Sequence, residues 1–459
     1  MVFGIAILTV TGCTMGPDYV RPPVPEPRDY REEFPSGETV ANVPWWEMFE
    51  DTVLINLIDT ILENNRNLAI SLARINAARA QLGIVRSDLF PRLDYFGDGG
   101  VSGNTEEDGT SWDATVGLSA SWQVDLWGRF RRSNEAALQE LLATEEAYRG
   151  LTITLVAEAA NAYLLLCDLD NRYEISVQTV KAWEYSLEVI RTRFEAGMVS
   201  EVDVNQAEIQ VFEAEVSVQT FDRLRAQTEN ALSVLLGVPP TAIERGLSLQ
   251  AQELSPEIPV GLPSVLLKRR PDVLEAERRL HAQTARIGVA EALKFPQFNL
   301  LGNLGGAFNG GETGFFDLGA EFFGPLFNAG KNQRQVDVQV ALTEQFVNQY
   351  EQTILQAYRE VSDAMVAVRT YRAEYESRSR QMAAAQNAAQ LSWVRYEGGL
   401  TSYLEVLDLQ RSLFTSQLKA SETRQLEITS IVRLYAALGG GWVAEQDTIG
   451  VFGEMQAGE

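Results

Sequence analysis

Residues that often carry chemistry are scarce in this sequence. It holds one histidine, His281, and two cysteines, Cys13 and Cys167. A zinc site, a Cys–His pair or a disulfide framework needs several such residues at defined spacings, and a Ser–His–Asp triad would have to use His281. We therefore expect no metal site, no cofactor and no enzyme activity, and we interpret His281 as a structural side chain.

The overall composition is acidic. The 459 residues include 38 Lys and Arg against 63 Asp and Glu, which gives a formal net charge of −25, and 45% of the residues are apolar. Nucleic acid is disfavoured as a partner, because binding phosphates requires a dense basic surface. Length alone would suggest two or three soluble domains.

A short apolar run at the start of the chain ends at a cysteine. Residues 2–12 are too few to span a bilayer and fit the core of a signal peptide, although no Lys or Arg precedes them. The four residues ending at Cys13 (Val-Thr-Gly-Cys) resemble a bacterial lipobox, and Thr14 in place of Asp indicates the outer membrane in that pattern. We predict a signal peptide at 1–12 and a covalent lipid on Cys13; the alternative is an apolar N-terminus with an incidental cysteine.

Prolines divide the chain into looped and helical stretches. Of the 16 prolines, seven lie in 17–44 and five in 239–263, whereas 131–237 and 326–459 contain none. Because proline breaks helix interiors, the two proline-free stretches are predicted to be helical. An unbroken helix over 131–196 would be roughly 100 Å long, which indicates a coiled-coil or tubular assembly.

The most apolar part of the first long helix is 151–167. Glu158 and Asn161 lie in its middle, where a charge is costly in lipid. We therefore predict a helix buried between neighbouring helices, with Cys167 a buried and unreactive thiol.

Two copies of one unit account for most of the chain. The copies, at 51–237 and 263–439, align without a gap from about 124 when the sequence is shifted by 202 residues. The matching pairs include Gly128 and Gly330, Tyr148 and Tyr350, Glu158 and Glu360, Gly197 and Gly399, Ser200 and Ser402, and Phe212 and Phe414. Each copy is predicted to contain a helix, a strand pair, a very long helix and a returning helix.

The boundaries follow from this alignment. In the first copy we expect a strand pair at 91–126, a long helix at 131–196 and a helix at 201–236; in the second, a strand pair at 296–327, a long helix at 331–397 and a helix at 402–438. The remaining segments are a lipidated, extended N-terminus at 13–50, a proline-rich linker at 238–262 and a C-terminal tail at 440–459.

The predicted strands alternate apolar and polar residues over unusual lengths. From Trp112 to Val124 every even position is apolar and every odd position is polar or small. A soluble sandwich with one buried face would also alternate, but these strands are long enough to cross a bilayer and no partner sheet is available. Four strands have two open edges, which lipid does not tolerate. Two chains would close 8 strands and three would close 12; the small, polar alternate face suits a wet lumen and favours three.

Four motifs give a family resemblance: Val-Asp-Leu-Trp-Gly-Arg at 124–129, Leu-Lys-Arg-Arg-Pro-Asp at 267–272, the stretch 396–414, and Ala-Leu-Gly-Gly-Gly-Trp at 437–442. With them the chain resembles the TolC family of outer-membrane efflux proteins, in its lipoprotein (OprM-like, NodT) branch. The resemblance implies an α+β membrane protein and a homotrimer. Its 12-stranded outer-membrane barrel would continue into a periplasmic barrel of long helices, surrounded by a collar built from 17–50, 238–262 and 440–459.

The implied activity is passive export. The duct would serve an RND-type inner-membrane pump through a periplasmic adaptor, and it would contact outer-membrane lipid.

Two glycines mark the predicted helix reversals. Gly197 and Gly399 can adopt the positive φ of such a turn, and Ser200 and Ser402 follow at N-cap positions. The same residues would be needed for a plain reversal, but in the family these tips meet the adaptor.

A charged pair on the last helix is the candidate gate. Asp408 and Arg411 share a helix face at i, i+3 spacing, and as a solvated surface pair they would contribute little. In the family pattern, the matching Asp and the residue matching Leu404 constrict the tunnel, and those matching Arg411 and Tyr396 hold the closed state. The first copy has Phe194, Val202, Gln206 and Ile209 at the equivalent places, so the copies are not equal.

Other functions remain open at this point. The same duct could serve metal ions or secreted proteins, although the seven methionines are scattered. A stand-alone porin would not need the long helices, and a structural coiled-coil lipoprotein would not need the strands. The cargo is not determined by the sequence, and the acidity predicts a cation-selective pore.

Overall fold

The computed structural model describes residues 13–24, 45–103, 110–252, 267–308 and 311–440. The predicted signal peptide at 1–12, most of the N-terminal collar segment, the linker residues 253–262 and the tail after 440 lie outside the described residues. The chain divides into two compact units. Unit 1 combines residues 1–25, 72–147 and 272–354, and unit 2 combines 26–71, 148–271 and 355–459.

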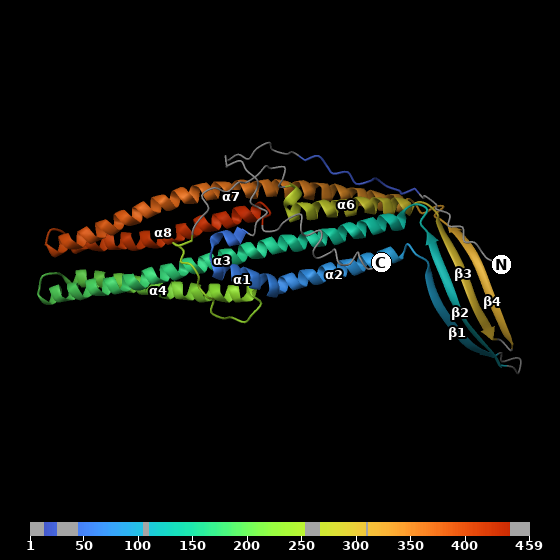
Figure 1. The fold of residues 1–459 in the computed structure, drawn as a ribbon, viewed down its shortest axis with the longest axis horizontal. Helices are drawn as coiled ribbons and strands as arrows, with labels where there is room; N and C mark the ends of the chain where they lie inside the picture. Colours follow the sequence, from blue (N-terminus) through green and yellow to red (C-terminus); the bar gives the residue numbers. More distant parts are fainter. Residues whose placement is uncertain (1–12, 25–44, 104–109, 253–266, 309–310, 441–459) are drawn as a thin grey trace. The chain divides into compact units, whose positions relative to one another are not determined.

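Unit 1 contains one antiparallel sheet of four strands in the order β1-β2-β3-β4 (Figure 1). The strands are β1 (Arg92–Gly103), β2 (Thr110–Val124), β3 (Gln297–Phe308) and β4 (Glu312–Phe323). The central pairing joins the two sequence copies, with Gly117 opposite Gly305. Both strand pairs lie within the ranges expected from the alternation, because a period of two is visible in sequence wherever one face is apolar.

The helices follow the repeat. Long helices α3 (Arg129–Glu195) and α7 (Lys331–Glu397) have 67 residues each, and the returning helices α4 (Glu201–Leu235) and α8 (Tyr403–Ala437) have 35 each. Helix α6 (Pro271–Ala292) precedes the second strand pair. The first copy differs from the expected single helix, because it has two: α1 (Thr52–Asn64) and α2 (Arg66–Ser87).

Asn65 causes that break. Its backbone is extended, and its side-chain oxygen accepts from the backbone amides of Asn67 and Leu68 at 2.8 and 3.3 Å. Its side-chain NH2 group donates to the Leu235 carbonyl at 2.8 Å. An Asn at this position caps the next helix, so α2 begins anew without any proline or glycine.

The N-terminal strap, residues 13–24, is fastened along unit 1. The Met15 amide donates to the Trp127 carbonyl at 3.1 Å, and buried Arg132 donates to the Met15 carbonyl at 3.2 Å and to Asp18 at 2.6 Å. Gly16 has φ +83°, and a Cβ there would lie 2.4 Å from the Gly288 Cα. The strap therefore depends on glycine on both sides of this contact.

Unit 2 is held around a buried carboxylate, Asp51, which is 1% exposed. It caps α1 and also holds the segment after α4. Its five hydrogen-bond donors are the amides of Val53, Leu54 and Leu247 and the side chains of Tyr163 and Gln252. A buried carboxylate is tolerated because these donors replace its hydration.

One described helix, α3, is long and apolar enough to cross a membrane, and 44% of that apolar stretch is buried inside the protein. Tyr163, Leu164 and Leu166 are fully buried, Glu158 is exposed, and Cys167 is a buried free thiol. Burial raises the pKa of Cys167 to about 12, so the thiol is inert at neutral pH. This packing matches the prediction of a helix buried between helices.

Candidate functional site

The apolar face of the sheet is exposed. On β2 Trp112, Val116 and Leu118 are 57, 53 and 47% exposed, and on β4 Phe316 and Leu318 are 78 and 87% exposed. The alternate β2 side chains from Thr115 to Gln123 are partly covered. A water-soluble sheet buries its apolar face instead, so this arrangement is typical of strands that face lipid.

The opposite face of the sheet is polar and acidic. Asp94, Asp98 and Asp113 lie on it in the first strand pair and Asp317 in the second; Arg92 pairs with Asp94 at 2.8 Å. The Asn303 amide donates to Asp317 at 3.0 Å. Polar side chains of this kind suit a water-filled lumen.

The predicted helix reversals have the expected backbone. Gly197 and Gly399 both have φ +70°, and the amides of Met198 and Leu400 donate back to the carbonyls five residues earlier at 2.8 and 2.9 Å. Met198 and Leu400 are 70 and 74% exposed, so each turn presents an apolar side chain at its tip.

The serines follow as N-caps. Ser200 precedes α4 and Ser402 precedes α8, both with extended backbone. The Asp203 carboxylate accepts from the Ser200 amide at 3.0 Å and from its hydroxyl at 2.8 Å. The carboxylate also complements the positive end of α4.

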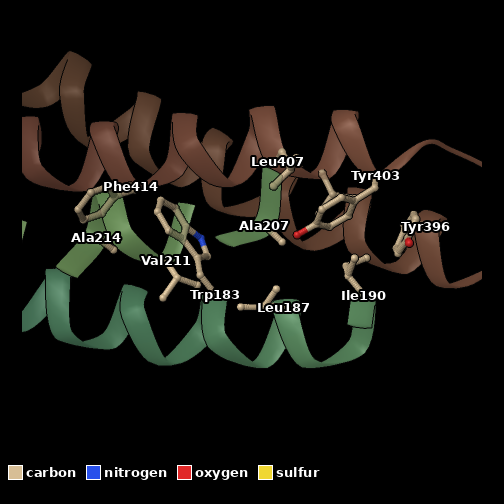
Figure 2. Packing of buried hydrophobic residues seen from close by; sticks show 11 residues of the cluster. Trp183, Leu187, Ile190, Ala207, Val211, Ala214, Tyr396, Tyr403, Leu407 and Phe414 are labelled. Carbon is tan, nitrogen blue, oxygen red and sulfur yellow. The ribbon is translucent and has the colours of Figure 1, made fainter. Parts of the chain in front are cut away.

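The four long helices share an apolar cluster near these turns (Figure 2). Its members are Trp183, Leu187, Ile190, Ala207, Val211, Ala214, Tyr396, Tyr403, Val406, Leu407 and Phe414. Trp183 of α3 meets Phe414 of α8 edge-on at 5.4 Å. The two helix pairs are therefore packed together through this cluster, whose residues come from both sequence copies.

Tyr396, a predicted gate residue, belongs to this cluster and is 6% exposed. The Arg193 guanidinium lies 4.5 Å from its ring centroid, and the Tyr403 ring lies at 5.4 Å. Its hydroxyl has no hydrogen-bond partner in the part of the chain that the structure describes. No local sequence pattern predicted this buried environment.

The other three predicted gate residues share an exposed face of α8. Leu404 is 62% exposed, Asp408 is exposed, and the Arg411 side chain is 53% exposed. Arg411 reaches toward α4, where its Nε lies 3.9 Å from the Glu213 carboxylate. With the Gln210 side-chain amide oriented so that its oxygen points at Arg411, that oxygen accepts from Nε at 3.1 Å. Asp408 and Arg411 also line a hollow of about 260 Å³.

The structure thus groups Leu404, Asp408 and Arg411 and separates Tyr396 from them. Gln210 and Glu213 were missed as partners of Arg411. The sequence repeat could have indicated these partners, because Ile209 and Arg411 are equivalent positions. If the two copies pack with similar faces, residues next to Ile209 on α4 lie near Arg411 on α8.

Cys13, the predicted lipid site, is exposed at the start of the described chain. Thr14 packs against Gly128, whose φ is +75°, and Met15 bonds Trp127. These contacts lie just beyond the end of β2 at Val124. An acyl chain on Cys13 would start at the border between strands and helices.

The basic run 268–270 closes the end of α8. Arg270 is 7% exposed and donates to the Ala437 carbonyl at 3.0 Å and to Glu360 at 2.7 Å. Arg269 donates to the Gly439 carbonyl at 3.4 Å, and burial lowers its pKa. Arg270 therefore caps the last carbonyl of α8, and Arg269 binds a carbonyl of the segment that follows the helix.

His281 has a structural environment. Its ring stacks on Tyr19 with centroids 4.5 Å apart, and Nε2 lies 2.9 Å from Glu135. Across the described ranges, no group of three or more His, Cys, Asp or Glu side chains could hold a metal ion.

An exposed apolar sheet face, a polar alternate face and paired long helices define a channel-type membrane protein. The chain belongs to the outer membrane efflux protein family, which it matches over residues 57–238 and 262–440. It is 37% identical to the probable efflux pump outer membrane protein TtgC of Pseudomonas putida, over 94% of this chain and 93% of that protein.

Two further similarities agree. The chain is 33% identical to the cation efflux system protein CusC of Escherichia coli, over 95% and 97% of the two chains. It resembles the open-state MtrE outer membrane channel of Neisseria gonorrhoeae with a TM-score of 0.86 and 29% identity, over 94% and 98%. The predicted family, the α+β fold and the outer-membrane location are confirmed. The chain is an outer-membrane efflux channel protein. Its relatives are efflux channels and not enzymes.

Proposed function

We propose that three copies of this chain form the exit duct of a tripartite efflux pump, through which small organic molecules leave the cell passively. The observation that carries the proposal is the four-stranded sheet, whose apolar face is exposed and whose edges are β1 and β4. Lipid contains no water to satisfy an open edge, so the sheet must close with other copies.

Three copies are favoured over two by the polar face. An eight-stranded barrel has its interior filled by side chains, whereas twelve strands leave a lumen. Burying the carboxylates of Asp98, Asp113 and Asp317 in a barrel filled by side chains would carry a large desolvation cost. In a water-filled lumen the same carboxylates stay hydrated. The relatives' efflux function also needs an open path.

The remaining partners follow from the helix turns and the N-terminus. Met198 and Leu400 are exposed at the turns formed by Gly197–Ser200 and Gly399–Ser402. We assign these turns to contact with the periplasmic adaptor that joins the duct to an RND-type pump. Cys13 would carry the lipid. Since one acyl chain alone binds a membrane only marginally, this lipid would add to the attachment that the barrel provides.

The gate is assigned to α8. Three copies of Leu404, Asp408 and Arg411 would meet in one duct, where three Asp408 carboxylates attract cations. Arg411 already contacts α4, so it could hold neighbouring helices together. Tyr396 would act through the packing of the helix turns, since it is buried.

Small organic molecules are the favoured cargo. Relatives are named for efflux of toluene, solvents and antibiotics, and one group for cations. Metal ions and secreted proteins stay as alternatives that the tests must separate.

The direct test is edge crosslinking in the purified full chain. Single cysteines stepped along β1 are combined with single cysteines stepped along β4, in a background without Cys167. Oxidation should give covalent trimers at one register, and the trimer should conduct in planar bilayers. The control places the second cysteine on central β3 at Asn303. Covalent dimers as the largest product, or a trimer that does not conduct, would refute the proposal.

Adaptor contact is tested separately. Cysteines at Ser200 or Ser402, crosslinked in cells, should capture a periplasmic adaptor. Exposed positions on α2, such as Arg74, supply the control. Equal capture at Arg74 and at the turns would remove the assignment.

A further inference from the structure

Two phenylalanines interrupt the polar face of the sheet at one level. Phe96 of β1 lies opposite Gly117 of β2, Gly117 lies opposite Gly305 of β3, and Gly305 lies opposite Phe315 of β4. We call these four residues the Phe-Gly row. It crosses all four strands with an aromatic ring at each end and glycine in the middle.

The rings lie on the glycines. A Cβ at Gly117 would lie 2.7 Å from Cζ of Phe96, and a Cβ at Gly305 would lie 2.7 Å from Cζ of Phe315. Such distances are too short for any side chain, so only glycine leaves room for the rings. Each ring therefore covers the backbone of its neighbouring strand and turns its other face away from the sheet.

Exposure separates these rings from the lipid-facing aromatics. Phe96 and Phe315 are both partly covered, whereas their sequence neighbours Tyr95 and Phe316, on the opposite face, are 89 and 78% exposed. The Phe-Gly row thus holds flat aromatic faces on the side of the sheet that carries the charges.

Carboxylates flank both rings. Asp94 and Asp98 lie two residues before and after Phe96, and Asp317 lies two residues after Phe315, so they share the rings' face. Arg92 neutralises Asp94 at 2.8 Å, but among the described residues no cation pairs with the exposed Asp98. An aromatic face beside an unneutralised carboxylate is complementary to an organic cation.

We propose that the Phe-Gly row is a weak binding subsite for small organic cations that carry an aromatic or apolar body. The proposal rests on the proposed function, because a closed barrel is what places the row on the lumen wall. The cationic group would lie near Asp98 and over the Phe96 ring, and the apolar body would contact the ring face. Covering glycine also fixes the strand register, and the test must separate that role from binding.

The probe is benzyltrimethylammonium, observed by saturation-transfer NMR on the detergent-purified trimer. Tetramethylammonium tests charge alone and benzyl alcohol tests the ring alone. Benzyltrimethylammonium should bind more tightly than either. Phe96→Leu with Phe315→Leu keeps apolar cover over the glycines and should weaken its binding by about two- to fivefold, the range of an exposed cation–π contact.

The matched control is Tyr95→Leu with Phe316→Leu, which removes the neighbouring aromatic rings from the opposite face and should leave probe binding unchanged. Asp98→Asn leaves rings and glycines untouched; it should weaken both cations and spare benzyl alcohol. Asp98→Asn decides the question if the double Leu variant fails to assemble.

The results that overturn the subsite are equal binding of benzyltrimethylammonium and tetramethylammonium, unchanged binding in the Phe96→Leu and Phe315→Leu double variant or in Asp98→Asn, or an equal loss in the control. Assembly and bilayer conductance are measured on the same preparations. A conducting trimer without the expected binding pattern refutes the subsite alone, whereas a chain that forms no conducting trimer refutes the duct.

Discussion

Replacing Asp51 with Ala should loosen the part of unit 2 that joins α1 to the segment after α4. The side chain is 1% exposed and accepts five hydrogen bonds, two from the first turn of α1 and three from Tyr163, Leu247 and Gln252. Losing a helix cap costs about 1 kcal/mol, and leaving a buried donor unsatisfied costs about 1 kcal/mol or more each. The sum for three donors and the cap is about 4 kcal/mol.

Hydrogen exchange measures this locally. A loss of about 4 kcal/mol corresponds to about a thousandfold loss of amide protection, since each 1.4 kcal/mol is tenfold. The loss should be concentrated in α1, whose buried residues include Leu54 and Ile58. Asp51→Ser should recover about 1 kcal/mol by capping α1 again, without restoring the contacts to Tyr163 and Gln252.

Two further variants test whether the buried carboxylate of Asp51 holds this region. Asp59 lies exposed on the same helix, so Asp59→Ala should change protection by less than about threefold, the usual limit for a surface substitution. Tyr163→Phe removes one of the five donors and should cost about 1–2 kcal/mol, and its effect should shrink when Asp51 is already Ala. Equal protection in Asp51→Ala and Asp59→Ala would show that the buried carboxylate does not hold this region.

Three further predictions concern the long helices. Asp408→Ala combined with Arg411→Ala should raise the closed-state conductance in planar bilayers, and an unchanged value would exclude these residues from the gate. Arg270→Ala should destabilise the end of α8 by about 1–3 kcal/mol, because the Ala437 carbonyl loses its buried donor and Glu360 loses its guanidinium partner. Hydrogen exchange of the last turn of α8 measures this loss. Burial raises the pKa of Asp168, so the folded state binds its proton more tightly than the unfolded state, and this contribution to stability is lost as pH rises through the raised pKa. Asp168→Asn should therefore flatten the rise in stability on acidification, measured by thermal unfolding across that range.

The pore is also expected to favour cations. Asp94, Asp98, Asp113 and Asp317 outnumber Arg92 on the polar face of the sheet, and rings of carboxylates select cations. The reversal potential of the reconstituted trimer in a salt gradient gives the answer. A potential that favours anions would contradict the placement of these carboxylates on the lumen.

Much of the fold could be predicted because its signals are local. Period-two alternation marks β2 from Trp112 to Val124, and glycine marks the reversals at Gly197 and Gly399, where φ is +70°. The proline-free stretches predicted α3 and α7 to within two residues at each end. In each case the decisive property belongs to the residue or its immediate neighbours.

Features that depend on distant partners could not be predicted in this way. Asp51 is followed by an ordinary helix start, and its burial depends on donors from Tyr163 and Gln252, more than 100 residues away. Tyr396 stands close to an exposed turn, yet Arg193 and Tyr403 enclose its ring. Asn65 breaks a helix through a side-chain cap that competes with continuation, and the sequence alone does not decide that competition.

The difference between the two copies supports the proposed gate on α8 more strongly than the charged pair does alone. Val202 and Leu404, equivalent positions, are 61 and 62% exposed, so both copies keep the same open helix face. On that face α4 continues with Gln206 and Ile209, which carry no charge, whereas α8 continues with Asp408 and Arg411. An uncharged helix face can be buried against another helix at lower cost, but Asp and Arg side chains need water or a polar partner. In a closed ring in which α4 and α8 alternate, α8 is therefore the helix that would stay beside water. A charge change on α8 would then alter the conductance of the duct without disturbing the packing that α4 supplies.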